Sequence, residues 1–319
     1  MDNNLLPFSE KYRPKEISDL VLDDVILSIL NDIIEKKDIP NIILTGTSGV
    51  GKTSTINVIA ESIYKKYKND MTIELNASDE RGIKSVNEII KNFCKKSVDF
   101  KNSLLTHKLI ILDEADNITP KAQRLINLTM EKYPNTRFAF TCNDSSKIIE
   151  AIQSRCVVLR FPKPPMNKYI EKIKKICNKE KIKYDEKALE YLYEKNQRDL
   201  RQTINMVELI SNAVEYINIE NINIVCNIPS QDNFIVLYDA ILEKDIKKIL
   251  LTINKFRNDG YFSLDILLYF IQFIKNYDSE TINEDIKNNF ISILSEKAFI
   301  MSKSSGNYID LSGAFLSLL

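Results

Sequence analysis

Short apolar runs alternate with helix-like segments between residues 40 and 161. The run Lys108–Leu112 is almost entirely apolar, which is typical of a parallel strand covered on both faces. In the stretch that starts at Thr53, apolar residues recur at the three- and four-residue spacing of one helix face. This alternation predicts an α/β fold with a mostly parallel sheet and helices on both faces. The predicted strands are 41–45, 71–76, 108–112, 137–142 and 157–160, and the predicted helices are 53–67, 86–93 and 120–132.

The pattern changes at residues 161–165, where three prolines occur within four residues. Proline continues neither a helix nor a central strand, so we place a domain boundary there. From Met166 to about Val225 the chain shows only helical periods, and Pro229 marks a second boundary. In the helical tail, Leu264–Ile274 is apolar around much of its circumference, which predicts burial on several sides, in part by neighbouring subunits. The predicted domains are 1–163, 164–228 and 229–319.

The charge of the chain is balanced, with 44 Lys and Arg residues against 44 Asp and Glu residues. A protein that binds nucleic acid alone is usually basic, so any DNA contact is expected from a local patch or an assembly. The single histidine argues against histidine catalysis, and five scattered cysteines indicate a reducing compartment. No apolar run approaches the roughly 18–20 residues that cross a bilayer, and the polar start lacks a signal peptide. We therefore expect an intracellular protein, neither secreted nor bound to a membrane.

The strongest chemical motif is Gly46-Thr-Ser-Gly-Val-Gly-Lys-Thr53, a Walker A pattern between a predicted strand and a predicted helix. Backbone N–H groups of such a loop surround phosphate oxygens, and the helix N-terminus adds its positive dipole end. Lys52 can reach the β- and γ-phosphates, and the Thr53 hydroxyl can bind Mg²⁺. The motif predicts a site for ATP and Mg²⁺. Its assigned residues are Gly46, Thr47, Ser48, Gly49, Val50, Gly51, Lys52, Thr53 and Ser54.

An acidic motif, Asp113-Glu-Ala-Asp116, follows the apolar strand. This is the Walker B arrangement, in which Asp113 holds the Mg²⁺ shell and Glu114 polarises the attacking water. Asn143 follows the next strand, where a polar side chain can orient that water and sense the γ-phosphate, although asparagine is also a common turn residue. Together these side chains predict an ATPase.

Two arginines are candidates for phosphate contacts, and the residues alone leave their roles open. Arg155 follows a short helical stretch and cannot easily reach its own nucleotide. It is either an arginine finger toward a neighbouring subunit or a surface arginine paired with a carboxylate. Arg201 begins a helix of the second domain. It either closes over the nucleotide or is an exposed helix residue, and the local pattern alone favours the second.

Several longer stretches of the chain match the sequence pattern of one known family. They are Glu10-Lys-Tyr-Arg-Pro14, Leu75-Asn-Ala-Ser-Asp-Glu-Arg-Gly82, 108–116, 129–138, 145–149 and Gln153-Ser-Arg-Cys156. Together they resemble the small subunits of replication factor C, an AAA+ ATPase family, over residues 10 to about 205. The resemblance implies a RecA-like AAA+ domain and a helical lid, followed by an all-α collar that is assigned by helical pattern only. In this family five subunits form an open ring that loads a sliding clamp, of the proliferating cell nuclear antigen type, onto primer–template DNA. The partners implied are the other subunits, the clamp and the DNA, and ATPase activity is expected mainly in the assembled complex.

The resemblance also assigns roles by position. Arg13 and Val21 match residues near the adenine, Asn143 matches the first sensor of the nucleotide, and Arg201 matches the second. Arg155 matches the finger that acts in trans on a neighbour's nucleotide.

Further contacts are implied on the surface of the ring. Asn76 resembles the residue that restrains Glu114 until DNA is bound. The residues expected to contact DNA phosphates, unless they are ordinary solvated side chains, are Arg81, Lys84, Thr119 and Lys121. The residues expected to face the clamp, unless they belong to the core, are Phe93 and Phe100.

The chain departs from the family pattern in three places. Asn127 and Leu128 stand where a pair of arginines is usual, which weakens any basic DNA track on that helix. Arg198 stands where glycine usually precedes the Asp-Leu-Arg stretch, so the start of the lid helix is expected to differ. The Walker A interior reads Thr-Ser-Gly-Val in place of the common Pro-Pro-Gly-Thr, with the general pattern intact.

Two other functions compete with clamp loading. A protein-remodelling AAA+ ATPase would need an aromatic pore loop after the second strand, where this chain has Asn-Ala-Ser-Asp-Glu-Arg-Gly. A ring subunit that binds ATP only as a structural wedge would not need Glu114, Asn143 and Arg155. A lysine-rich stretch between Lys163 and Lys183 is either a nucleic-acid patch, a nuclear localisation signal or a solvated helix face, and we favour the last interpretation. The expected location is the nucleus, or the cytoplasm of an archaeal or virus-infected cell.

Overall fold

The computed structural model divides into two compact units, Met1–Ile219 and Glu220–Leu319. The predicted division into domains at residues 163 and 228 stays a prediction. The residues described are 6–76, 83–96, 107–163, 165–196, 198–277, 284–304 and 306–319, with the backbone alone for 83–87.

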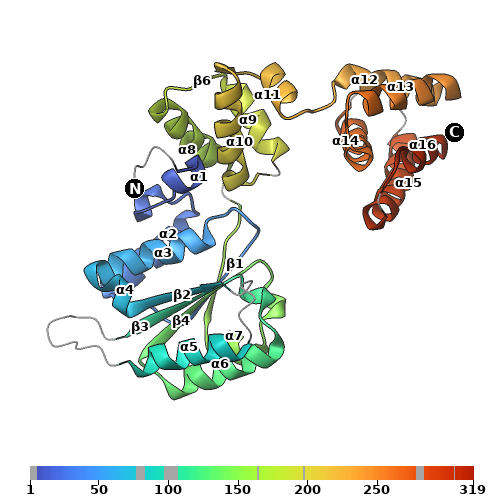
Figure 1. Cartoon of the computed structure of the whole chain (residues 1–319). Coiled ribbons are helices and arrows are strands. Elements are labelled where there is room, and N and C mark those ends of the chain that lie inside the picture. Colours follow the sequence, from blue (N-terminus) through green and yellow to red (C-terminus); the bar gives the residue numbers. More distant parts are fainter. Residues whose placement is uncertain are drawn as a thin grey trace. The chain divides into compact units, whose positions relative to one another are not determined.

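The first unit is built on a five-stranded parallel sheet with the strand order β2-β3-β4-β1-β5 (Figure 1). This confirms the predicted α/β fold. Each predicted strand is present, and the boundaries differ from the prediction by one residue at most. The strands are β1 (Ile42–Thr45), β2 (Thr72–Asn76), β3 (Lys108–Asp113), β4 (Thr136–Cys142) and β5 (Val157–Arg160).

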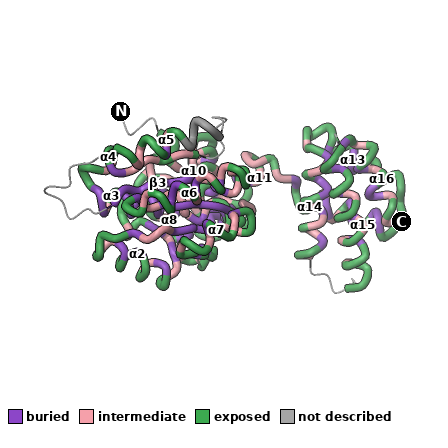
Figure 2. The backbone as a smooth tube through the Cα atoms, turned by 90° about the horizontal axis from the view of Figure 1, so that it is seen from below, coloured by how far each residue is buried: buried purple, intermediate pink, exposed green. Residues whose placement is uncertain are grey.

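Helices cover both faces of this sheet because β3 and its neighbours are apolar on both sides. Leu109 and Ile111 pack in one buried cluster with residues of α2 and α3. Ile110 and Leu112, which point the other way, pack in a second cluster with residues of α5, α6 and α7. Figure 2 shows the resulting buried interior in purple. The helices are α2 (Asp24–Lys36), α3 (Lys52–Tyr64), α4 (Lys68–Met71), α5 (Ile83–Lys95), α6 (Pro120–Lys132) and α7 (Glu150–Gln153), with short turns η2 (Ile17–Asp19), η3 (Lys65–Tyr67), η4 (Ala115–Asn117) and η5 (Ser145–Lys147).

Local sequence explains where the two helices nearest the site begin. Gly51 precedes α3 with a φ of 90°, a conformation that glycine adopts without steric cost. Pro120 is the first residue of α6, and the Thr119 side chain accepts a hydrogen bond from the Ala122 N–H at 3.4 Å. Thr119 is therefore the N-cap of α6.

A smaller bundle, the lid (residues 166–217), follows the prolines. Its helices are α8 (Met166–Lys179), α9 (Glu186–Lys195) and α10 (Leu200–Ala213). The prediction that this region is only helical is wrong, because β6 (Lys183–Tyr184) and β7 (Tyr216–Ile217) pair in parallel. Two-residue strands are too short to show an alternating pattern in the sequence.

The N-terminal strap (residues 8–22) joins the lid to the sheet domain. Its helix α1 (Phe8–Lys11) is fixed to the lid, where the Phe8 N–H donates to Glu208 at 2.8 Å and Lys11 pairs with Glu180 at 2.6 Å. Its other end packs Leu20 and Leu22 into the cluster formed with α2 and α3. The strap therefore contacts both the lid and the sheet domain of the first unit.

As predicted, the elements described in the second unit are helices, and they enclose an aromatic core around Phe234, Phe270 and Phe315. Within the single chain, α14 buries Leu267, while Leu268 is 45% exposed. The predicted burial of this side by neighbouring subunits stays a prediction. The helices are α11 (Ile219–Val225), α12 (Gln231–Leu242), α13 (Ile246–Asn258), α14 (Ser263–Asn276), α15 (Glu284–Lys303) and α16 (Tyr308–Leu316).

Within the part of the chain that the structure describes, no helix combines the length and the apolar character needed to cross a bilayer.

The backbone before α10 generates a test of the unusual arginine in the lid. Arg198 has a φ of 61°, a left-handed conformation that glycine adopts readily and that costs other residues about 1 kcal/mol or more. Its exposed pair with Glu194, at 3.7 Å, compensates little. We expect Arg198→Gly to stabilise the fold by about 0.5–1 kcal/mol in thermal unfolding. Arg198→Ala, which keeps the strain, should give no gain, and an equal gain in both variants would contradict this explanation.

Candidate active site

A cavity of about 280 Å³ lies at the carboxyl edge of the sheet, walled by the Walker A loop, the N-terminal strap, α8 and α10. Because the strands are parallel, the segments that follow β1, β3 and β4 all reach this edge. Gly46, Thr47 and Arg155 do not line the cavity. The predicted residues that do are Arg13, Val21, Ser48, Gly49, Val50, Gly51, Lys52, Thr53, Ser54, Asp113, Glu114, Asn143 and Arg201.

Lys52 lies at the centre of the polar end of the cavity. Its Nζ donates to the carbonyl oxygens of Gly46 at 2.7 Å and Thr47 at 2.9 Å, and to Asn143 Oδ1 at 2.9 Å. Burial lowers the pKa of Lys52, while nearby carboxylates, including Asp113, act in the opposite direction. The ammonium group is thus held by neutral oxygens, contacts that it can exchange for the oxygens of a phosphate group.

Asp113 forms the other polar anchor. Its Oδ1 accepts a hydrogen bond from the Thr53 hydroxyl at 2.8 Å and another from the Thr141 hydroxyl. The Thr141 hydroxyl also accepts from the Glu114 N–H at 3.1 Å. The sequence analysis overlooked Thr141. This residue is buried in β4, and nothing in the local sequence distinguishes it from an ordinary core threonine.

Glu114 has a strained backbone and an available side chain. Its φ and ψ are 53° and 42°, in the left-handed region that non-glycine residues avoid. Its side chain is exposed and accepts from Asn117 Nδ2 at 3.3 Å. Backbone strain of this kind costs about 1–3 kcal/mol and concentrates at functional sites. Asn76 ends β2 in register with Asp113, at the same edge.

Asn143 connects three parts of the edge. Besides accepting from Lys52, it donates its backbone N–H to Asp116 Oδ2 at 3.2 Å. Its carbonyl oxygen accepts from the Thr45 hydroxyl at 3.4 Å. Its side chain is therefore fixed next to the end of Lys52, within the predicted phosphate region.

The strap and the lid form the less polar end of the cavity. Arg13 and Val21 line the cavity there, together with Leu20 of the strap and Ile204 of α10, and their contact with an adenine stays a prediction. This end combines apolar walls with a few polar groups, which suits a heterocyclic base better than a polyphosphate.

Lys172 also lines this end, which corrects its interpretation as part of a solvated helix face. Its Nζ donates to the Asp19 carbonyl oxygen at 3.2 Å, and burial lowers its pKa. No local pattern indicates this placement, because one lysine among many on α8 turns inward only through the packing of the lid on the strap.

The predicted arginines are not equally close to the cavity. Arg201 lines it, with a side chain that is 71% exposed and lies 3.8 Å from Glu10 Oε1. Arg13 is 3.4 Å from the other oxygen of Glu10. Arg155 lies outside, where it pairs with Glu131 and donates to the Ala151 carbonyl oxygen at 3.2 Å. The carboxylate pairing that the sequence left open is thus present in the single chain, and both partners remain partly exposed.

The residues predicted to contact DNA are only partly described. Thr119 and Lys121 are exposed at the start of α6. Lys84 lies in α5, within the stretch described by its backbone alone, and Arg81 lies outside the described residues. Leu128, one of the two positions where arginines were expected, is 58% exposed on the same helix α6.

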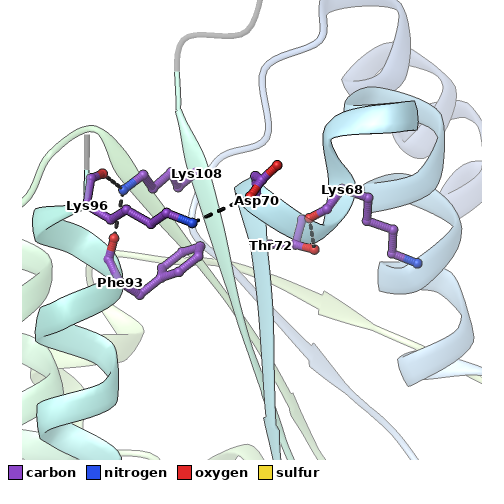
Figure 3. A network of polar contacts seen from close by, with 6 residues as sticks. All are labelled: Lys68, Asp70, Thr72, Phe93, Lys96 and Lys108. Atoms are coloured by element: carbon purple, nitrogen blue, oxygen red, sulfur yellow. Dashed lines mark hydrogen bonds and ion pairs between the residues drawn. The ribbon is translucent and has the colours of Figure 1, made fainter. Parts of the chain in front are cut away.

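Of the two predicted clamp-facing aromatics, Phe100 lies outside the described residues. Phe93 is half-buried and packs against the cluster beneath α5. Lys108, buried at the start of β3, donates to the Phe93 carbonyl oxygen at 2.7 Å and to that of Lys96, and lies over the Phe93 ring (Figure 3). Lys96 in turn lies 3.4 Å from Asp70, so the end of α5 is fastened to the sheet edge.

The Thr141 hydroxyl generates a prediction about catalysis. Thr141→Val keeps the shape of the side chain but removes the donor to Asp113 and the acceptor for the Glu114 N–H, at a cost of about 1–3 kcal/mol for the unpaired group. We expect ATP hydrolysis to fall about tenfold or more in steady-state assays. Thr136→Val, at the opposite end of the same strand, is the matched control and should stay close to the unchanged chain. If both variants lost the same fraction of ATP hydrolysis, the cause would be reduced stability of the strand and not the missing hydroxyl contacts.

Comparisons with known proteins agree with this geometry. Residues 42–163 match the "ATPase family associated with various cellular activities (AAA)", and residues 229–317 match the "Replication factor C C-terminal domain". The fold resembles the RuvB Holliday junction branch migration motor of Thermotoga maritima, with a TM-score of 0.55 at 13% identity over 72% of this chain and 79% of that chain.

Relatives of known name cover nearly the whole chain. It is 35% identical to a replication factor C small subunit of Acanthamoeba polyphaga mimivirus, over 99% of this chain and 97% of that protein. It is 33% identical to replication factor C subunit 4 of Oryza sativa subsp. japonica, over 97% of this chain and 91% of that protein. The chain therefore belongs to the replication factor C small-subunit family and carries its AAA ATPase domain.

Proposed function

We propose that this chain is an ATPase subunit of a clamp loader, which uses ATP binding and hydrolysis to load a sliding clamp onto primed DNA. The observation that carries the proposal is the meeting of Lys52, Asp113 and Asn143 at one edge of the sheet, under a lid that supplies Arg201. Membership of the replication factor C family supports the link to DNA replication.

The donor set at Asp113 fits Mg²⁺. The Thr53 hydroxyl and the Asp113 carboxylate lie 2.8 Å apart, and Mg²⁺ prefers hard oxygen ligands of this kind together with phosphate oxygens. When bound, the metal would offset phosphate charge. The Thr141 hydroxyl donates to the same oxygen of Asp113 as Thr53, so the carboxylate is held ready for this role.

Each remaining side chain has a distinct task in the proposed reaction. Lys52 exchanges its contacts with the loop carbonyls for phosphate oxygens, and Asn143 orients the attacking water. Glu114 accepts hydrogen bonds from that water. Its carboxylate is exposed and accepts a hydrogen bond from Asn117, which leaves acceptor positions for the water. Arg201 turns from Glu10 toward the phosphates when the nucleotide is present, a small cost because the exposed pair is weak.

Arg13 and Val21 of the strap are proposed to hold the adenine. They lie at the less polar end of the same cavity as Lys52, so a nucleotide that reaches both ends contacts the sheet domain, the strap and the lid together. Closure of the lid on the nucleotide would then be transmitted through the strap contacts with Glu180 and Glu208.

The proposed ring assigns the surface residues. The chain is divided into an ATPase domain (1–163), a lid domain (164–228) and a collar (229–319) that joins it to other replication factor C subunits. Arg81, Lys84, Thr119 and Lys121 contact DNA phosphates, Asn76 restrains Glu114, and Phe93 and Phe100 face the clamp. The site of action is the place of DNA replication within the cell, in the nucleus or the cytoplasm.

Clamp loading predicts a specific dependence on partners and salt. ATP hydrolysis by the assembled complex should rise severalfold or more when a sliding clamp and primed DNA are present together. The stimulation should fade between about 50 and 200 mM salt, because contacts with phosphates release counterions. A rate indifferent to clamp and DNA at every salt concentration would contradict the loader function while leaving the ATPase site intact.

Arg155 predicts that active sites are shared between chains. Arg155→Ala and Lys52→Ala should each lower hydrolysis in the assembly at least about a hundredfold, since arginine fingers contribute about 10³–10⁵ in rate. Mixing the two variants should restore part of the activity, because one chain supplies the finger and the other the nucleotide site. The matched control is a chain with both substitutions, which should stay inactive when assembled alone. No recovery in the mixture would argue against a finger that acts in trans.

A further inference from the structure

The start of lid helix α10 rests directly on the Walker A loop. The Asp199 carboxylate occupies the space where a side chain of Gly49 would be. A β-carbon at Gly49 would lie 2.2 Å from Asp199 Oδ1, 2.4 Å from Cγ and 2.6 Å from Oδ2. These distances are far shorter than any van der Waals contact, so only glycine at position 49 allows the lid to sit where it does.

Asp199 is held in this position by its own helix. It is 9% exposed, and its Oδ1 accepts from the Gln202 N–H at 3.0 Å as the N-cap of α10. Its backbone carbonyl oxygen accepts from the Thr203 hydroxyl at 2.7 Å. Turning the carboxylate away from the loop would break its N-cap hydrogen bond with Gln202, so displacing the carboxylate loosens the start of the helix.

The neighbouring glycine of the loop shows that this contact is particular to position 49. Gly51 has a φ of 90° and Gly49 a φ of 74°, so both have a backbone conformation that favours glycine. A β-carbon on Gly51, however, would meet no atom within 4 Å. Backbone conformation alone accounts for glycine at 51, whereas the lid also requires it at 49.

We propose that Asp199 is a positioning residue that seats the start of α10 on Gly49 and thereby places Arg201 over the phosphates. Arg201 is two residues further along the same helix and lines the cavity, so its reach is set by where the helix start rests. This inference rests on the proposed contact of Arg201 with the nucleotide. It adds a direct contact between the lid and the Walker A loop, whereas the bond between Lys52 and Asn143 lies within the sheet domain.

The contact between Asp199 and Gly49, here called the seat, is tested by hydrogen exchange in the nucleotide-free chain. Gly49→Ala should raise amide exchange in the peptide that spans the start of α10, because the added methyl group displaces Asp199. Gly51→Ala carries similar backbone strain without a neighbour and should leave that peptide unchanged. Equal exchange in the two variants would overturn the seat, whatever the outcome of clamp-loading assays, so the two failures remain distinguishable.

A double-mutant cycle then links the seat to nucleotide recognition. Asp199→Gly removes the carboxylate and places at this N-cap a residue that N-caps tolerate well. Gly49→Ala alone should weaken ATP binding about tenfold or more, and adding Asp199→Gly should recover severalfold of that loss. In the Gly51→Ala background the same change should bring no recovery. Equal, multiplicative effects in both backgrounds would contradict the proposal.

The ratio of ADP to ATP dissociation constants separates positioning from a loss of lid stability. Displacing Arg201 should lower this ratio in Gly49→Ala to the value of Arg201→Ala, and combining the two changes should lower it no further. A lid that is merely destabilised would weaken ADP and ATP binding equally. An unchanged ratio in Gly49→Ala would therefore overturn the assignment of Asp199 as a positioning residue.

Discussion

The hydrogen bond between Thr53 and Asp113 joins the two halves of the site, and it depends on the register of a parallel sheet. Thr53 opens the helix after β1, and Asp113 ends β3, two strands away in the sheet. Because every strand runs in the same direction, the segments that follow β1, β3 and β4 reach one edge without any long excursion of the chain. The apolar residues on both faces of β3 fix this register, so the core packing and the position of the site have the same cause.

The lid is held over this edge by contacts of several kinds. The strap fastens to α8 and α10 through Glu180 and Glu208, and Lys172 reaches back from α8 to the strap. Exposed ion pairs among these are individually weak, so they can yield when a nucleotide draws the lid closer. The contact between Asp199 and Gly49 is different in kind, because it depends on excluded volume rather than on an exposed ion pair. Together they allow the lid to respond to the nucleotide while its helix start keeps its place.

The sequence predicted the sheet and the phosphate end of the cavity from local signals. A continuous apolar run identified β3, and the spacing of glycines, Lys52 and Thr53 identified the phosphate end. The sequence did not predict Thr141 and Lys172 as cavity residues, because their neighbours come from distant segments. No local pattern distinguishes them from a core threonine or a solvated lysine. The pairing of β6 with β7 and the exposure of Leu268 depend on packing that no periodicity encodes. The roles of Arg13, Val21, Arg155 and Arg201 came from family resemblance, and they stay predictions.

The central claim is that one nucleotide spans the sheet edge, the strap and the lid. Photo-crosslinking with 8-azidoadenosine triphosphate, followed by peptide mapping, tests it most directly, because the label reports the base while the loop binds the phosphates. The account predicts labelling of the strap or of the facing parts of α8 and α10, competed by ATP and lost in Lys52→Ala. Labelling confined to other segments, or labelling of the strap that persists undiminished in Lys52→Ala, would contradict it.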